Sequence, residues 1–286
     1  MAFRTAGLAV ALATIAGGAA ALSLSADAAD SSGWLLKCSY VKSAPDDPIV
    51  HPGMAGMSHM HDFYGNKSTS AASSYRSMTA APSTCTSGDT AGYWTPALFR
   101  NGVKINPAGS YGKTTVREQV YYRANNVSGQ KTVTSFPADF RMVAGNAHAA
   151  GPAQNPELGH EIYWGCSDNS EHGKLSAPQD CKTGVITLHV GFPNCWNGVL
   201  SPVDDTPNVT YPKGGSCPAR FPIVLPRLIE RFEYPVGTSS AGITLASGPV
   251  YTVHADFWNT WQQGALQKLV TDCLNAHKDC GTNPKV

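Results

Sequence analysis

Two short segments contain histidines at a spacing that suits metal ligation or general-base catalysis. His59 and His61 are separated by one residue, and His254 and Asp256 are separated in the same way. In an extended chain alternate side chains share a face, so each pair projects to one side of its segment. Two imidazoles that project together can ligate Zn, Cu, Ni or Fe, or bind an anionic or hydroxylated ligand. A carboxylate beside an imidazole raises its basicity, for general-base catalysis or for metal ligation.

A metal site needs a third ligand in addition to the His59/His61 pair. The candidates are His51, His189 and His254, and the set we favour for a divalent metal is His51, His59 and His61. We assign catalytic roles to the two pairs together, on the expectation that they line one pocket. The alternative is that His59 and His61 are a chance surface pair. In that case His254 and Asp256 form a buried pair that stabilises the turn before a helix.

Aromatic side chains offer flat apolar faces that stack on sugar rings, although most of them belong in the core of a domain of this size. We expect Trp196 and Trp258 to be exposed, because Trp196 lies in a loop and Trp258 directly precedes a helix. The side chains predicted to bind substrate are Trp196, Trp258, Asn259 and Tyr64.

Several common catalytic motifs are absent from the sequence. It contains no Gly-x-Ser-x-Gly, His-Glu-x-x-His, Walker or Gly-x-Gly-x-x-Gly motif. Its glutamates are few and scattered, and nothing marks Glu230 and Glu233 as the carboxylate pair of a glycosidase. The residues therefore favour histidine-based or metal-assisted chemistry.

The charge balance excludes one class of partner. Lys and Arg number 21 and Asp and Glu 20, which gives a net charge of +1 with no basic cluster. A nucleic-acid-binding protein needs a basic surface, so we expect no nucleic-acid partner. The 28 glycines and 20 prolines favour a fold rich in turns and loops.

The first 28 residues have the pattern of a secretory signal peptide. Arg4 precedes an apolar run over residues 8–22, and Ala26-Asp27-Ala28 is a small-x-small cleavage site. The apolar run is shorter than the ~20 residues of a membrane span. We therefore expect a signal peptide over 1–28 and a single secreted, extracellular domain over 29–286, with no membrane contact after cleavage.

An even number of cysteines after a signal peptide predicts disulfide bonds in an oxidising compartment. Eight cysteines allow on the order of 100 pairings, among which the sequence does not decide. Short loop closures favour Cys166–Cys181, Cys195–Cys217 and Cys273–Cys280, which leaves Cys38 for Cys85.

Short apolar segments bounded by turn residues predict strands, whereas spacings of three and four predict one helix. The helix begins near Trp261 and extends to Leu274, with Asn259 as its expected N-cap and Gly281 beyond its last turn. We expect a mainly β fold, an antiparallel sandwich-like single domain with long disulfide-tied loops and a C-terminal helix. The predicted strands are Trp34–Tyr40, Tyr93–Phe99, Val116–Tyr122, Phe140–Ala144, Ile162–Cys166, Val185–Val190, Ile223–Phe232 and Gly242–Ala246.

Several motifs together resemble the secreted family catalogued as domain of unknown function 1996, found in bacteria and fungi. The matching pieces occur in the family's order over nearly all of the chain after residue 28. They include Asp47-Pro48-Ile49-Val50, Ser58-His59-Met60-His61-Asp62-Phe63-Tyr64-Gly65-Asn66, Tyr93-Trp94-Thr95-Pro96, Phe192-Pro193-Asn194-Cys195-Trp196 and His254-Ala255-Asp256-Phe257. Two departures are the segment 204–209, where we expect histidines, and Asn197, where an aspartate is usual.

Members of this family are secreted and are sometimes joined to carbohydrate-binding modules, which implies work on polysaccharide or cell-wall glycan. We therefore expect a polysaccharide hydrolase or lyase with a His/Asp site, assisted by a divalent metal. The alternative is a non-catalytic extracellular protein that binds polysaccharide or metal through the same side chains. The residues do not decide whether the protein is an enzyme.

Overall fold

The computed structural model describes residues 32–286 except 112–113, 116–117, 125–126, 131, 169–173 and 204–205, together with Met1. The predicted signal peptide and part of the departure at 204–209 therefore lie outside the described residues. No helix among the described residues is long and apolar enough to cross a membrane.

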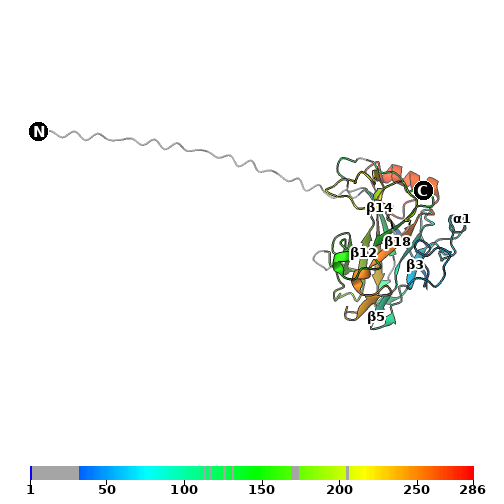
Figure 1. Ribbon diagram of the computed structural model, residues 1–286, viewed down its shortest axis with the longest axis vertical. Helices are drawn as coiled ribbons and strands as arrows, with labels where there is room; N and C mark the ends of the chain where they lie inside the picture. The colour runs from blue at the N-terminus through cyan, green and yellow to red at the C-terminus, as the bar shows by residue number, and fades with distance from the viewer. Residues whose placement is uncertain are drawn as a thin grey trace.

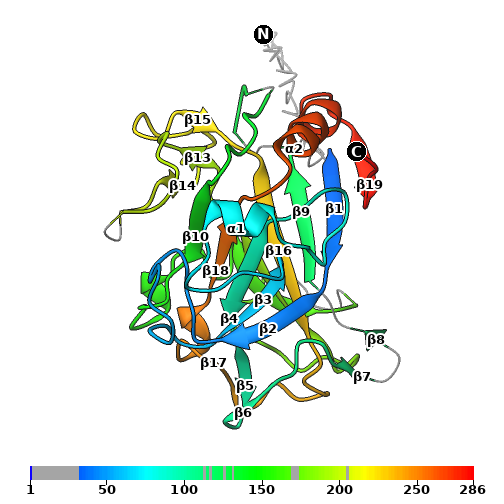
Figure 2. The same cartoon turned by 90° about the vertical axis from the view of Figure 1, so that its right-hand side faces the viewer.

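Two large β-sheets form the centre of the fold (Figure 1; Figure 2). The six-stranded sheet has the order β11-β12-β16-β9-β1-β19, and the five-stranded sheet has the order β10-β18-β4-β3-β2. Every pair in them is antiparallel except β1 with β19. The strands of the first sheet are β1 (Gly33–Cys38), β9 (Glu118–Arg123), β11 (Ile162–Cys166), β12 (Ile186–Gly191), β16 (Arg227–Tyr234) and β19 (Asp279–Thr282). Those of the second are β2 (Tyr40–Ala44), β3 (His61–Gly65), β4 (Gly92–Pro96), β10 (Arg141–Gly145) and β18 (His254–Trp258).

The inner faces of both sheets contribute to one hydrophobic core. On β9 buried and half-buried residues alternate, so Val120 and Tyr122 face the core. Tyr122 stacks on Trp34 of the neighbouring strand, with ring centroids 4.7 Å apart. Tyr64 of the second sheet contacts Phe232 of the first at 5.2 Å. The predicted mainly β, antiparallel architecture is confirmed, and all eight predicted strand segments contain observed strands.

The outer face of the five-stranded sheet is also buried. Phe63, Trp94 and Trp258 project from this face and pack with Ile49 and Met78 into a second, smaller apolar cluster. Met78 belongs to α1 (Tyr75–Thr79), and Ile49 belongs to the long connection between β2 and β3. Because side chains alternate along a strand, the residues two positions from Phe63 and Trp258 share this covered face. These residues are His61 and Asp256. His254, two positions before Asp256, lies on the same face.

Smaller sheets and helices complete the fold. The C-terminal helix is α2 (Gln263–Leu269), continued by the π-helical turn η3 (Val270–Leu274). The predicted helix is confirmed, but its N-cap is Gln262 rather than Asn259. Asn259 is fully buried and donates hydrogen bonds to the carbonyls of Phe136 and Pro137, so it anchors a loop instead. The other elements are β5 (Leu98–Arg100), β6 (Val103–Lys104), β7 (Ser110–Tyr111), β8 (Thr114–Thr115), β13 (Cys195–Trp196), β14 (Val209–Thr210), β15 (Ile223–Val224), β17 (Ile243–Leu245), η1 (Pro152–Gln154) and η2 (Val250–Thr252).

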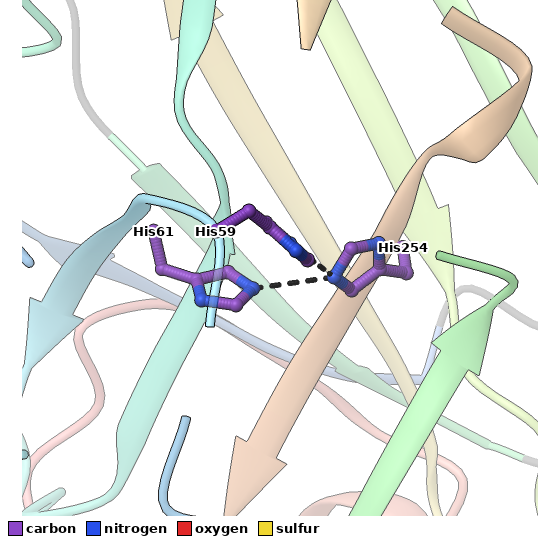
Figure 3. A group of neighbouring side chains, drawn as sticks. All are labelled: His59, His61 and His254. Atoms are coloured by element: carbon purple, nitrogen blue, oxygen red, sulfur yellow. Dashed lines mark hydrogen bonds between the residues drawn. The ribbon is translucent and has the colours of Figure 1, made fainter. Parts of the chain in front are cut away.

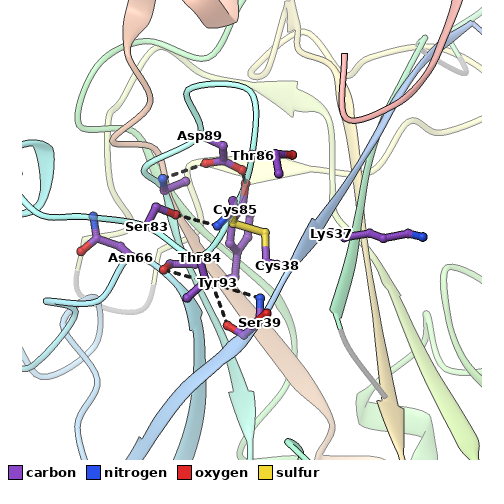
Figure 4. Close-up of a disulfide and its surroundings, with 12 residues drawn as sticks. Lys37, Cys38, Ser39, Asn66, Ser83, Thr84, Cys85, Thr86, Asp89 and Tyr93 are labelled. Carbon is purple, nitrogen blue, oxygen red and sulfur yellow. Dashed lines mark hydrogen bonds between the residues drawn. A yellow bond between two sulfur atoms is a disulfide. The ribbon is translucent and has the colours of Figure 1, made fainter. Parts of the chain in front are cut away.

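All eight cysteines form disulfides, and the pairing is the one that short loop closures favour. Cys38 at the end of β1 is joined to Cys85, which lies in the connection before β4 (Figure 4). Nearby, Thr84 accepts from the backbone N–H of Ser39 and donates to its carbonyl. This bond therefore ties the six-stranded sheet to the loops of the other sheet.

We expect removal of the Cys38–Cys85 bond, by replacing both residues with Ala, to lower the free energy of unfolding by about 4 kcal/mol. The bond spans 47 residues, so its loss frees a long loop in the unfolded chain. The matched control removes Cys273–Cys280, which spans 7 residues and is expected to cost about 2 kcal/mol. Denaturant unfolding measures both, and an inverted order would contradict the prediction.

Candidate metal centre

Three histidines from distant parts of the chain meet on the covered outer face of the five-stranded sheet (Figure 3). His61 is the first residue of β3, and His59 precedes it by two residues in the same extended segment. His254 is the first residue of β18, which lies on the other side of β4. His254 Nε2 lies 3.2 Å from Nε2 of His59 and 3.2 Å from Nε2 of His61.

Backbone carbonyls determine the tautomers of two of these rings. His61 Nδ1 lies 3.0 Å from the carbonyl oxygen of Asp46, and His254 Nδ1 lies 3.0 Å from that of Thr252. A carbonyl oxygen only accepts, so in each neutral ring the hydrogen is on Nδ1 and Nε2 has a bare lone pair. The two bare nitrogens face one another at 3.2 Å and form no hydrogen bond. If His59 has its hydrogen on Nε2, it can donate to His254 Nε2. The contact between His61 Nε2 and His254 Nε2 still has no hydrogen between its two atoms.

A proton on one of the facing Nε2 atoms would turn their contact into a hydrogen bond, but protonation of these rings is disfavoured. Burial, reinforced by the charges of nearby histidines, lowers the pKa of His254 to about 3 and that of His59 to about 4. Burial also lowers the pKa of His61 well below its ordinary value, again reinforced by neighbouring histidine charges. The rings are therefore neutral near pH 7, and their lone pairs could hold a metal cation.

The spacing of the nitrogens matches that of a metal site. Imidazole nitrogens about 2.0–2.1 Å from a zinc ion, at tetrahedral angles, lie about 3.3 Å from one another. The two observed separations are 3.2 Å. A backbone carbonyl on the opposite ring nitrogen is also the usual partner of a metal-bound histidine. Three neutral imidazoles suit Zn, Cu, Ni or Fe.

A cavity of about 710 Å³ opens beside the cluster. His59 and His254 line it together with Asp47, Asp256 and His51, and with aliphatic side chains from three loops. None of the described lining residues is Lys, Arg, Trp, Tyr or Phe. The volume is ample for a small-molecule ligand or for part of a larger one.

Two buried carboxyl groups lie next to the histidines. An oxygen of Asp47, a nitrogen of His61 and an oxygen of Asp256 all lie within 4.8 Å of one another. Asp47 accepts hydrogen bonds from the N–H groups of Ile49 and Val50. Both oxygens of Asp256 are buried and have no hydrogen-bond partner among the described residues. Burial and the charge of Asp47 raise the pKa of Asp256 well above its ordinary value.

The model of the family described as Domain of unknown function (DUF1996) matches residues 47–261. The chain belongs to the DUF1996 family. The matched residues contain the three clustered histidines, both carboxyl groups and every described residue that lines the cavity. No curated protein and no solved structure matches the chain.

The DUF1996 structure brings together the two pairs that the sequence singled out, because β3 and β18 belong to one sheet. His254 rather than His51 completes the histidine cluster, and His51 instead lines the cavity. The other third-ligand candidate, His189, lies on β12 of the six-stranded sheet. There it stacks on Tyr163 with ring centroids 4.4 Å apart, outside the cavity.

The side chains predicted to bind substrate are all buried. The expectation that Trp196 and Trp258 are exposed is wrong, since they are 8% and 0% exposed. Trp258 is on the covered face of its sheet, with Arg141 3.9 Å above its ring and its indole N–H donating to Asp139. Asn259 and Tyr64 are buried as well, and Tyr64 packs in the main core.

Sequence reasoning missed several residues that line the DUF1996 cavity. The sequence did contain a signal for Asp47, because an aspartate at the start of a turn often accepts a hydrogen bond from the backbone N–H two residues later. His148, Pro202 and Pro207 had none. They come from loops whose path depends on the packing of distant segments.

Proposed function

We propose that this DUF1996 protein is a secreted, metal-dependent hydrolase that acts on polysaccharide or cell-wall glycan. The observation that carries the proposal is the convergence of three neutral imidazoles, two with Nδ1 held by carbonyls, beside a carboxyl group that has no hydrogen-bond partner among the described residues. The four disulfides fit the oxidising compartment in which a secreted protein works. The glycan substrate is the expectation that the family resemblance suggests.

The donor set supports hydrolysis in particular. His59, His61 and His254 would hold a divalent ion, which supplies a Lewis acid and lowers the pKa of water. Asp256 lines the same cavity, and neither of its oxygens has a hydrogen-bond partner among the described residues. Burial raises its pKa, which suits a group that would take a proton from water and return it to the leaving oxygen. The carbonyls of Asp46 and Thr252 keep two of the rings in the required tautomer.

Elimination on uronic acids, the lyase alternative, finds less support. Such a lyase neutralises the substrate carboxylate with a metal or a cationic side chain. None of the described residues that line the cavity is Lys or Arg, so in a lyase the metal alone would have to neutralise that carboxylate. An uncharged substrate fits this lining better, which favours the hydrolase.

Metal analysis combined with a product screen tests the proposal. We expect the purified full chain to contain close to one divalent ion, and to release product from at least one of a panel of plant, fungal and bacterial glycans. EDTA should abolish turnover, and re-addition of zinc, copper, nickel or iron should restore it. Purified protein that binds no divalent ion would contradict the proposal. Saturable glycan binding with no bond broken would instead identify a non-catalytic binding protein.

A further inference from the structure

The exposed apolar side chains of the molecule are concentrated around one cavity. Among the described residues, nine large apolar side chains are exposed, and three of them are Met1, Val286 and Val103. The other six lie on the two loops that flank the cavity beside the histidine cluster. They are Val50, Met54 and Met57 on the first loop, and Val199, Leu200 and Val203 on the second.

Hydrogen bonds connect both groups to the cavity wall. On the first loop the Met54 N–H donates to the carbonyl of His51, and the Met54 carbonyl accepts from the N–H of Met57. His51 and Met57 both line the cavity. On the second loop the carbonyl of Val199 accepts from the amide of Asn208, another lining residue, and Pro202 lines the cavity directly before Val203. We call these six side chains the apolar rim.

The cavity wall combines apolar side chains with polar ones, among them His51, Asn146 and Asn208. Ile49, Val143 and Val209 line it, as do Pro202 and Pro207. Lys and Arg are the usual partners of an anionic group, and the described lining contains neither. Exposed apolar patches of this kind mark binding sites, because leaving them in water is unfavourable. The group complementary to the apolar rim is uncharged and aliphatic.

We propose that the apolar rim and the cavity bind an aliphatic acyl chain, and that the bond hydrolysed is the ester that joins this chain to a hydroxyl group. The proposal rests on the proposed function and names its substrate class. Water oxygen forms a bond to the acyl carbon and the ester C–O bond breaks. One proton of the water passes to the departing alkoxide, so the products are a carboxylic acid and an alcohol.

Two series of uncharged probes test the proposal with the full chain. The first compares hydrolysis of p-nitrophenyl acetate, butyrate, hexanoate and octanoate. We expect kcat/KM to rise two- to fourfold per methylene while the added carbons remain on the apolar rim. The second measures calorimetric binding of methyl and octyl β-thioglucoside below the micelle concentration, which requires no bond cleavage. Octyl thioglucoside is expected to bind at least tenfold more tightly.

Lysine substitutions on the apolar rim show where the chain binds. Met57→Lys and Val203→Lys are expected to lower the octanoate-to-acetate ratio of kcat/KM, and octyl thioglucoside affinity, at least fivefold. Val103→Lys is the matched control, because Val103 is 68% exposed on β6 and does not line the cavity. It should change neither quantity.

The two series separate the failure of this proposal from that of the proposed function. Chain-length-independent hydrolysis, or equal effects of the rim and control substitutions, would overturn the acyl-chain proposal while leaving a hydrolase in place. Tight, rim-dependent binding of octyl thioglucoside without hydrolysis of any ester or glycan would support the aliphatic ligand and overturn the hydrolase.

Discussion

Replacing His59 with Ala is expected to weaken the binding of a divalent ion about 100-fold or more. A site with three or four ligands binds its ion with roughly 10–16 kcal/mol, so one ligand contributes about 3 kcal/mol. His59 is the most exposed of the three clustered histidines and lies in a loop, so its loss should leave the fold intact. Competition with a chelator of known affinity, together with metal analysis of the purified protein, measures the effect.

The matched control for this substitution is His51→Ala. His51 lines the same cavity but is not in the histidine cluster, so its replacement should change metal affinity less than about threefold. Equal losses in both variants would show that the ion binds elsewhere in the cavity. No loss in either variant would exclude the three-histidine centre.

Replacing Asp256 with Asn is expected to lower turnover by a factor of about 100 to 10,000 while metal content is unchanged. This range is the usual contribution of a general base. Asn has nearly the same shape but does not take up a proton. Because the Asp256 carboxyl group is fully buried and neither oxygen has a partner in the described part of the chain, its neutral replacement should not lower the free energy of unfolding. Initial rates with the glycan or ester found by screening, and denaturant unfolding, measure the two effects.

Glu230→Gln is the control for the loss of a buried carboxyl group. Glu230 is also fully buried, and neither of its oxygens has a partner among the described residues, but it lies on β16 of the other sheet. Its replacement should leave turnover unchanged. If Asp256→Asn and Glu230→Gln had the same small effect on turnover, Asp256 would have no catalytic role.

Local patterns were sufficient for the strands and for the C-terminal helix. The alternation of buried residues on β9 and the spacing of apolar residues from Trp261 to Leu274 depend on the local sequence alone. Short loops likewise favoured the observed disulfides. Asn259 was misassigned as an N-cap because its side chain bonds to a loop more than 120 residues away in sequence. The exposure of Trp196 and Trp258 was mispredicted for a similar reason, since Phe140 packs against the Trp196 ring and Asp139 accepts from the Trp258 indole N–H.

The amino-acid sequence by itself determined which side chains project together, since His59 with His61 and His254 with Asp256 follow from the period of an extended chain. Only the tertiary structure decided that His254, and not His51, joins the first pair. That choice depends on β3 and β18 flanking β4, an order of strands that arises because β18 pairs with β4, with Asp256 beside Trp94, far away in the sequence. Local periodicity specifies the face of a strand, whereas the neighbours of that strand are set by the packing of the whole chain.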